Sequence, residues 1–304
     1  MLTKLTIAIP TYRRNDYLVR LLNTIPSNLR VKVVISDNEC HVTNDIKQEF
    51  DKFTFIGSKQ KLGMFQNWNV ALENVDTEWF ILPSDDDMFC TDSFDKIDSV
   101  LKQNPLGDVF IFGHNVIDEN DNVISSWAPE KFKSFENFEG FKVFMKGVDA
   151  RCPSIILRTK LARKMGSFDE SLDFTAADSL LIQKCLLYGK SVFVPEIISS
   201  YRVWPNNFTN QLIATKGWMD KIEMWTDKLG FVLRKDFFKL FSETKIKNIK
   251  DEIFAQNLLA GISKIRKNEG LVVALKFIIE NRYPYRANFK TQLVIIKTLL
   301  LGWV

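Results

Sequence analysis

Apolar and polar residues alternate in blocks along the first third of the chain. Five short apolar runs predict strands, at 5–10, 31–36, 53–57, 79–83 and 108–113. Between them apolar residues recur every three or four positions, which predicts helices near 12–25, 42–50, 63–73 and 92–102. The runs are continuously apolar, as is typical of parallel strands that are covered on both faces. The pattern therefore predicts an α/β fold with a mostly parallel sheet flanked by helices.

The pattern changes twice further along the chain. The stretch VIDENDNVISSW predicts a hairpin with a polar turn. It is followed by predicted helices at 137–146 and 178–188 and predicted strands at 153–157 and 191–194. Beyond residue 210 strand signals disappear, and helices are predicted at 211–230, 234–267, 270–280 and 287–301. We therefore expect boundaries near residues 110 and 210, with a C-terminal α-helical extension.

Composition places the chain among globular proteins. Of its 304 residues, 46% are hydrophobic and only 13 are glycine, which excludes disordered and collagen-like classes. The formal net charge is +4, but residues 216–304 alone hold 17 Lys and Arg against 9 Asp and Glu. The C-terminal region is therefore basic and the remainder mildly acidic. Nucleic acid, a membrane surface and a solvated helix face are all compatible with such a region.

Cysteine and histidine chemistry is sparse. The four cysteines are far apart without a CxxC pair, and the two histidines are His41 and His114. A zinc site or a His-based nucleophilic triad is therefore not expected. The N-terminal apolar run is too short for a signal peptide, and no run reaches the roughly 18 apolar residues of a transmembrane helix. We expect a cytoplasmic protein.

Three polar clusters follow predicted strands. They are Pro10-Thr11-Tyr12-Arg13, Asp37-Asn38-Glu39 and Asp85-Asp86-Asp87. In open α/β sheets, ligands bind outside the carboxyl ends of the parallel strands. Three consecutive carboxylates repel one another, and their oxygens suit Mg²⁺ or Mn²⁺. The alternative is an acidic helix N-terminus, but the position directly after WFILP favours a metal site.

The usual nucleotide-binding loops are absent from the sequence. Neither GxGxxG nor GxxxxGK[ST] occurs, so a bound nucleotide would depend on side chains and a metal. Asp37 suits a contact with a base N–H group, and Tyr12 suits a stacking contact with the base ring. Simple packing of Tyr12 and a turn or cap role for Asp37 are equally compatible with the sequence.

Taken in order, several segments resemble the family-2 inverting glycosyltransferases of the Rossmann-like GT-A fold. These segments are AIPTYRRNDYLVRLL, VVISDNE, KLGMFQNWNVAL, TEWFILPSDDD and GSFDESLDFTAADSLLIQKCLLYGKSVFVPEIISSYRVWPNNFT. The resemblance covers about residues 3–210. It implies transfer of a sugar, with inversion, from a nucleotide-sugar donor (a UDP-sugar is favoured) to an acceptor hydroxyl. It also implies a nucleotide-sugar-binding half at 1–110 and an acceptor-side half at 111–210, whereas the basic helical region at 211–304 lies outside the resemblance.

The resemblance assigns donor-site roles to particular residues. Pro10, Thr11 and Tyr12 match the opening donor loop, and Asp37 matches the carboxylate that contacts the base. Gly63 and Asn67 match the segment beneath the nucleotide, with Lys61 near the base or phosphates. Asp85, Asp86 and Asp87 match the DxD region, which holds Mn²⁺ or Mg²⁺ and the donor diphosphate. Because Ser84 occupies a position where an extra Asp is common, Asp87 is the favoured metal ligand, with Asp85 and Asp86 in support.

On the acceptor side the resemblance is less complete. Asp178 matches the catalytic base, which must take the acceptor proton in a direct displacement. An N-cap role for Asp178 is the alternative, and Asp173 is a weaker candidate base. Ala177 replaces a common Glu, and Trp204 replaces a His that many relatives carry. Arg202 is expected to neutralise phosphate, while Trp204 suits either stacking against a sugar or packing.

The basic C-terminal region suggests a partner beyond the donor. Residues 271–304 combine apolar stretches with Lys276, Arg282, Arg286, Lys290 and Lys297. Such a segment suits peripheral contact with the inner face of the cytoplasmic membrane. That would fit a saccharide or lipid-linked saccharide acceptor in capsule, O-antigen or exopolysaccharide synthesis. Packing on the core or in a homo-oligomer is the alternative, and nucleic acid is not expected because no recognition motif is present.

Two other functions are compatible with parts of the sequence. A nucleotidyltransferase also uses carboxylates and Mg²⁺ on an α/β sheet, but it would need a basic, glycine-rich phosphate loop that AIPTYRRNDY lacks. A nucleotide-sugar-binding scaffold with impaired catalysis is the second, because Ala177 and Trp204 depart from the pattern. Turnover of a nucleotide sugar distinguishes an enzyme from such a scaffold.

Overall fold

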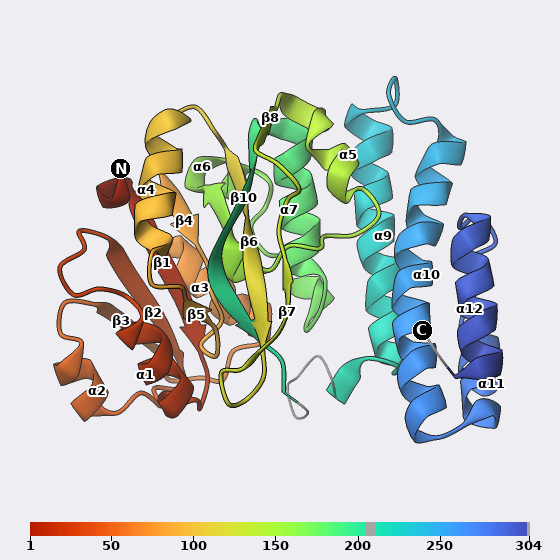
Figure 1. The fold of residues 1–304 in the computed structure, drawn as a ribbon, viewed down its shortest axis with the longest axis horizontal. Coiled ribbons are helices and arrows are strands. Elements are labelled where there is room, and N and C mark those ends of the chain that lie inside the picture. The colour runs from red at the N-terminus through yellow and green to blue at the C-terminus, as the bar shows by residue number, and fades with distance from the viewer. Residues whose placement is uncertain (205–210, 303–304) are drawn as a thin grey trace. The chain divides into compact units, whose positions relative to one another are not determined.

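The computed structural model describes residues 1–204 and 211–302 (Figure 1). These residues form two compact units. The first comprises Met1–Phe144, Val148–Asp173 and Leu181–Trp204, and contains the sheet. The second comprises Met145–Gly147, Phe174–Leu180 and residues 211–302, and is helical.

One sheet organises the first unit. Its ten strands are β1 (Leu5–Thr11), β2 (Lys32–Asn38), β3 (Thr54–Ser58), β4 (Trp79–Ile81), β5 (Met88–Phe89), β6 (Val109–Ile117), β7 (Val123–Trp127), β8 (Lys133–Phe135), β9 (Ile155–Arg158) and β10 (Ser191–Arg202). The order is β3-β2-β1-β4-β9-β6-β10-β5, with β7 beside β6 and β8 beside β10. Strands β3, β2, β1 and β4 are mutually parallel, as are β6 and β10, whereas β9 runs antiparallel to both of its neighbours. Strands β5, β7 and β8 also pair antiparallel with their neighbours, and the predicted α/β sheet with its set of parallel strands is confirmed.

Helices cover both faces of this sheet. They are α1 (Asn15–Asn23), α2 (Asn44–Glu49), α3 (Met64–Glu73), α4 (Ser93–Gln103), α5 (Phe141–Phe144), α6 (Thr159–Lys164) and α7 (Ala177–Tyr188), with 3-10 turns η1 (Leu2–Lys4), η2 (Asn137–Glu139), η3 (Cys152–Ser154) and η4 (Glu170–Leu172). Helices α1, α2 and α4 pack on one face of the sheet. Their residues Leu18, Ile46 and Ile97 lie in one buried cluster with alternate residues of β1. Helix α3 contacts β1 and β2, and its Asn67 meets Ser36 from the other face.

The later strands differ from prediction for an identifiable reason. Strand β10 was expected to end at Val194 but continues to Arg202. Pro195 has no N–H to donate, and the pairing of β10 with β6 shifts register between Phe193 and Ile197 before it resumes. The short strands β5 and β8 and helix α6 were not predicted, because two to six residues carry too little periodic signal.

Four long helices make up most of the second unit. They are α9 (Lys216–Asp236), α10 (Glu243–Asn268), α11 (Leu271–Glu280) and α12 (Phe289–Leu301). Hydroxyl and amide side chains cap three of them, namely Thr215, Ser242 and Asn288. The break expected after residue 230 is wrong, because α9 runs through Gly230. Gly230 lies against α10, since a Cβ there would meet Ile246 Cγ2 at 3.4 Å, an ordinary van der Waals distance.

Two neighbouring carboxylates on α10 hold the connection between α11 and α12. Asp251 accepts hydrogen bonds from Arg282 Nη1 at 2.6 Å and from the Arg286 N–H at 2.8 Å. Glu252 accepts from the side-chain amide of Asn288 at 2.7 Å and from the Thr291 hydroxyl at 3.2 Å. Both carboxylates are buried, so this link is fixed rather than loosely tethered. No helix in the described parts of the chain combines the length and apolarity needed to cross a membrane.

Candidate functional site

Three consecutive carboxylates follow β4 in a tight, buried turn. Asp85, Asp86 and Asp87 are only 4%, 8% and 1% exposed. The Asp87 N–H donates to the Ser84 carbonyl at 3.1 Å, which closes the turn before β5 begins. Strand β4 pairs with β1, so this acidic turn lies beside the polar residues that end β1.

The first and last carboxylates of the turn are engaged mainly by local groups. Asp85 Oδ2 accepts from the Thr11 hydroxyl at 2.8 Å and from the Tyr12 N–H at 3.2 Å. Asp87 accepts the N–H of Ser84 on one oxygen and the N–H of Arg202 on the other, at 2.8 and 3.3 Å. Burial raises the pKa of Asp87 well above its ordinary value, and neighbouring Asp86 raises it further.

Asp86 is the most open of the three. Its Oδ2 accepts from Arg14 Nη1 at 3.0 Å and from the Trp204 indole N–H at 3.2 Å. Its Oδ1 accepts no hydrogen bond from any described residue. The same Arg14 nitrogen reaches Asp85 Oδ1 at 3.1 Å, so one guanidinium bridges two carboxylates. Asp86 therefore retains a free ligand oxygen in the turn.

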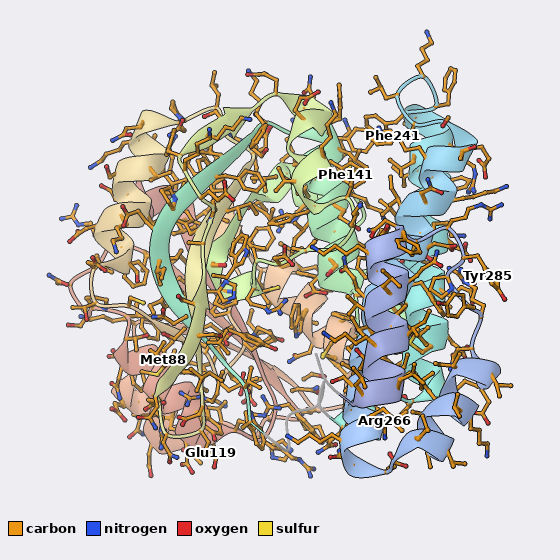
Figure 2. The ribbon with its side chains drawn as sticks, turned by 45° about the vertical axis from the view of Figure 1, so that its right-hand side comes forward. Met88, Glu119, Phe141, Phe241, Arg266 and Tyr285 are labelled. Carbon is orange, nitrogen blue, oxygen red and sulfur yellow. The ribbon has the colours of Figure 1, made fainter. Side chains whose placement is uncertain are left out.

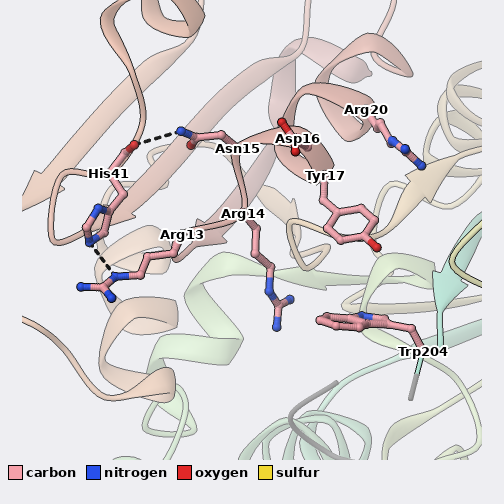
Figure 3. A pocket seen from close by; sticks show the side chains of 8 residues that line it. All are labelled: Arg13, Arg14, Asn15, Asp16, Tyr17, Arg20, His41 and Trp204. Carbon is pink, nitrogen blue, oxygen red and sulfur yellow. Dashed lines mark hydrogen bonds between the residues drawn. The ribbon is translucent and has the colours of Figure 1, made fainter. Parts of the chain in front are cut away.

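A pocket of about 660 Å³ opens beside Arg14 (Figure 3). Its lining comes from the β1–α1 loop, helix α1, His41 and Trp204. The Arg14 guanidinium lies 5.6 Å from the Trp204 ring, and the Tyr17 ring lies 6.0 Å from the same indole. On the far wall Arg13 Nε donates to His41 Nε2 at 2.9 Å. The pocket thus combines guanidinium groups with aromatic faces.

Tyr12 lies between two cations at the end of β1. Arg13 and Lys61 approach its ring at 5.1 and 5.3 Å from the centroid. The Tyr12 hydroxyl bonds Glu39, and this contact is the largest cause that lowers the pKa of that carboxyl. Arg13, Glu39 and Cys40 all adopt positive φ, between 55° and 61°. The contacts of Tyr12 therefore connect the loop after β1 with the loop after β2.

The other predicted donor-side residues support the backbone. Asp37 is 1% exposed and accepts from the N–H groups of His41 and Val42, which agrees with the turn interpretation of this residue. Asn67 is buried and its amide donates to the carbonyls of Thr11 and Ser36, both at 3.3 Å. These contacts hold the ends of β1 and β2 together beneath the site.

Gly63 and Pro10, two further predicted donor-site residues, lie at the start of α3 and within β1. Gly63 caps α3, and its N–H donates to Gln66 Oε1 at 2.8 Å. Pro10 pairs with Ser36 within the parallel ladder.

Arg202 is buried against the acidic turn. Its side chain is fully inaccessible, with Nε on the Asp86 carbonyl at 2.8 Å and Nη1 on the Asp118 carbonyl at 2.7 Å. Nη2 pairs with Asp121 at 2.5 Å. Protein acceptors therefore engage all three guanidinium nitrogens, and the role of Arg202 toward phosphate stays a prediction. Arg202 instead holds the turn against β10 and the β6–β7 hairpin.

The predicted acceptor-side residues occur around the start of α7. Asp178 lies half-buried in the first turn of this helix, directly after Ala177, in the second compact unit. Ala176 and Asp173 adopt positive φ of 67° and 56°, so the chain entering the helix is sharply bent. The catalytic role of Asp178 stays a prediction. His114 is buried on β6, and burial lowers its pKa to about 4, so it is neutral at physiological pH.

A family model described as glycosyl transferase family 2 matches residues 6–166, more than half of the chain. The chain belongs to this family. An uncharacterized glycosyltransferase of Methanocaldococcus jannaschii is 22% identical over 239 residues, which cover 77% of this chain and 78% of that protein. An uncharacterized glycosyltransferase of Rickettsia typhi is 24% identical over 216 residues, which cover 67% of this chain and 65% of that protein.

Solved structures place the fold of this family-2 chain among the GT-A glycosyltransferases. The S. aureus TarS structure superimposes with a TM-score of 0.55 at 16% identity, covering 99% of this chain and 92% of that one. TarS in complex with UDP-GlcNAc gives a TM-score of 0.58 at 15% identity, covering 98% and 92%. A Pyrobaculum calidifontis mannosyltransferase in complex with GDP-Man and Mn²⁺ gives 0.55 at 14% identity, covering 98% and 86%. The predicted GT-A fold is confirmed.

One central residue of this family-2 site was not predicted. Arg14 contacts Asp85 and Asp86, flanks the Trp204 ring and lines the pocket. The doubled arginine directly after the Thr-Tyr of the donor loop was the available signal. A sequence shows that the two arginines are adjacent, but it does not show which of them turns toward the carboxylates.

The acidic turn fits a divalent cation on grounds of charge. Two of the three buried carboxylates, Asp85 and Asp86, contact one guanidinium, that of Arg14, and the Arg202 guanidinium binds main-chain carbonyls and Asp121 instead. Burial raises the pKa of Asp85 to about 6 against the opposing effect of Arg14, and neighbouring Asp86 raises it further. Carboxylate oxygens are the ligands that Mg²⁺ and Mn²⁺ prefer. No cluster of three or more acidic, His or Cys side chains that could hold a metal ion occurs among the described residues.

We expect this buried charge to appear as a pH dependence of stability in metal-free buffer. The pKa of Asp85 is about 6 in the folded chain and near 4 when unfolded, so between these pH values only the unfolded chain releases the proton. The free energy of unfolding should therefore fall by about 3 kcal/mol as the pH rises from 4 to 7.

Urea denaturation of wild type and Asp85→Asn in EDTA isolates this contribution. The difference between the two proteins should change with pH as described and become flat above about pH 7. A difference that is constant with pH, or that favours the wild type as the pH rises, contradicts the raised pKa.

Proposed function

We propose that the protein transfers a sugar, with inversion, from a nucleotide-diphospho-sugar to a hydroxyl of a saccharide or lipid-linked saccharide. The observation that carries the proposal is the buried acidic turn at the carboxyl end of β4, where Asp85 accepts the main-chain N–H of Tyr12, whose ring is flanked by Arg13 and Lys61. Family-2 membership supports it. The nucleotide-sugar and Mn²⁺ complexes named for TarS and the mannosyltransferase make a UDP-sugar or GDP-sugar donor reasonable, and we favour UDP.

The side chains around Tyr12 suit the two ends of such a donor. We propose that the base lies against the Tyr12 ring and that its arrival moves Lys61 or Arg13 from the ring toward the diphosphate. Both cations are within reach of an anion next to the ring. Pro10, Thr11, Gly63 and Asn67 would act through the backbone they hold, and Asp37 by fixing the loop after β2.

For the metal we propose Asp86 as the principal ligand, in place of the Asp87 that the sequence favours. Asp86 has the free oxygen and the largest exposure in the turn, whereas both Asp87 oxygens accept main-chain N–H groups. Asp85 remains a supporting ligand. When bound, Mn²⁺ or Mg²⁺ supplies a Lewis acid that stabilises the negative charge of the departing nucleoside diphosphate.

For the chemistry at the acceptor we propose Asp178 as the general base. It accepts the proton of the acceptor hydroxyl as the oxygen attacks the anomeric carbon from the face opposite the leaving group, which inverts the configuration. We further propose that residues 1–110 serve the donor, 111–210 the acceptor and 211–304 a basic helical region, and that the enzyme acts in bacterial surface-polysaccharide synthesis in the cytoplasm.

Screening nucleotide sugars for binding and hydrolysis tests the proposal directly. We expect UDP, and one or a few UDP-sugars, to raise the melting temperature in Mn²⁺ but much less in EDTA, with slow release of UDP from the cognate donor. Nucleoside triphosphates without a sugar are the control, since a nucleotidyltransferase would bind and cleave these instead. Binding without any turnover would assign a scaffold, and no metal-dependent binding of any nucleotide sugar would reject the proposal.

A further inference from the structure

Helix α12 exposes a continuous apolar stripe. Phe289, Leu293, Ile296 and Leu300 recur at intervals of four, three and four residues, so they lie on one face of the helix. Their side chains are between 45% and 75% exposed. Ile295 and Thr298, by contrast, are its only fully buried residues in the described structure. A helix of this apolarity normally buries its larger face, so the exposed stripe requires a partner outside the described residues.

Helix α11 repeats the arrangement. Val272, Leu275 and Ile279 are 79%, 40% and 82% exposed, while Ala274 and Phe277 are buried. Both α11 and α12 pack on α10. Their exposed stripes therefore point away from α10, and Tyr285 between them, 79% exposed, projects from the same connection (Figure 2). We name the stripes of α11 and α12 together with Tyr285 the α11–α12 patch.

The helices that carry the patch are held in place by contacts with α10. Asp251 and Glu252 accept hydrogen bonds from the connection between the helices and from the first turn of α12. Arg266 of α10 also donates from Nε to the Leu299 carbonyl at 2.7 Å, which fixes the last turn of α12. Several large apolar side chains are thus held toward solvent by buried polar contacts, at a cost that only an external partner offsets.

The charges around the patch distinguish the possible occupants. Residues 271–302 contain five basic side chains and one acidic side chain, and Lys276, Lys290 and Lys297 are exposed beside the stripes. A second copy related by two-fold symmetry would bring these lysines against identical lysines, with little acidic charge to pair them. An anionic lipid surface complements both the apolar stripes and the lysines, because the acyl chains contact the apolar side chains and the headgroup phosphates pair with the lysines.

We infer that the α11–α12 patch is a docking surface for an anionic lipid bilayer. The helices lie in the headgroup region with their stripes toward the acyl chains and the flanking lysines on the phosphates. The inference concerns the helical unit alone and holds whatever sugar or acceptor the enzyme uses. If the proposed glycosyl transfer is also correct, this surface would deliver the enzyme to lipid-linked acceptors.

Vesicle co-sedimentation of the full chain tests the inference. Wild type should bind vesicles of phosphatidylcholine with about one-third phosphatidylglycerol far better than phosphatidylcholine alone. Lys290→Gln with Lys297→Gln should weaken partitioning onto the anionic vesicles about 10- to 30-fold, since each basic residue near such a surface contributes about a factor of five. Leu293→Glu with Leu300→Glu should abolish binding, because the apolar insertion is lost.

A matched control introduces the same charges at exposed apolar positions outside the patch. Val123→Glu with Ile124→Glu, both 60% exposed on β7, should bind like wild type. Circular dichroism checks that each variant is folded, and nucleotide binding is measured separately so that failure at the donor site is not mistaken for failure here. Absence of wild-type binding, or equal loss in the control, overturns the inference. A dimer in light scattering that Leu293→Glu with Leu300→Glu dissociates would assign the patch to a second copy instead.

Discussion

Asp178→Asn should lower kcat for sugar transfer by about 10²- to 10⁴-fold while leaving the affinity for UDP within about twofold of wild type. The amide has almost the same shape but cannot take the proton of the attacking hydroxyl. The residue directly before it is Ala177, so the adjacent position offers no second carboxylate. Single-turnover transfer to a supplied saccharide acceptor, with UDP affinity from calorimetry, measures both quantities.

Asp173→Asn is the matched control, because it removes a carboxylate from the same bend before α7. We expect it to keep most of the turnover. Should Asp173→Asn cause the large loss and Asp178→Asn a small one, the base is Asp173. If neither matters, the transfer does not depend on a carboxylate from this segment.

Asp86→Asn should remove most of the effect of Mn²⁺ on UDP binding, a loss of about 10²-fold in metal-dependent affinity. The substitution keeps a hydrogen-bonding group near Arg14 and Trp204 but removes the charged oxygen that is free for a cation. Isothermal titration of UDP in Mn²⁺ and in EDTA, on the same preparation, gives the metal-dependent part as a ratio.

Asp87→Asn separates the two possible ligands. Its oxygens accept the N–H groups of Ser84 and Arg202, so its replacement should lower the melting temperature more than Asp86→Asn does. The Mn²⁺ effect on UDP should largely persist. If Asp87→Asn loses the Mn²⁺ effect at unchanged stability while Asp86→Asn keeps it, Asp87 is the ligand, as the sequence alone favours.

The sequence predicts most of the first unit because its strands are apolar on both faces and its helices are amphipathic. Strand β1 and helix α4 occur within one or two residues of expectation. What it cannot predict depends on contacts between distant segments. The continuation of β10 beyond Pro195, for example, depends on its pairing with β6.

The same division applies to the candidate site. That Asp85, Asp86 and Asp87 lie together with the end of β1 follows from their position after an apolar strand. The individual role of each carboxylate cannot be predicted in this way, because the three differ only in which N–H groups of the folded chain lie next to them. Arg202 shows the difference most clearly, because a cation expected at a phosphate is buried on Asp121 and two carbonyls.

The hydrogen bonds of Asp251 and Glu252 to the α11–α12 connection reduce the conformational entropy that binding to a partner would cost. Peptides as short as α11 and α12 would be largely unfolded in water if they were free. Segments that fold only when they reach a surface lose part of their binding free energy to ordering. Here that ordering is complete before any partner arrives, because it is a by-product of folding onto α10. The helix pair can therefore associate and dissociate quickly with no change in its helical content.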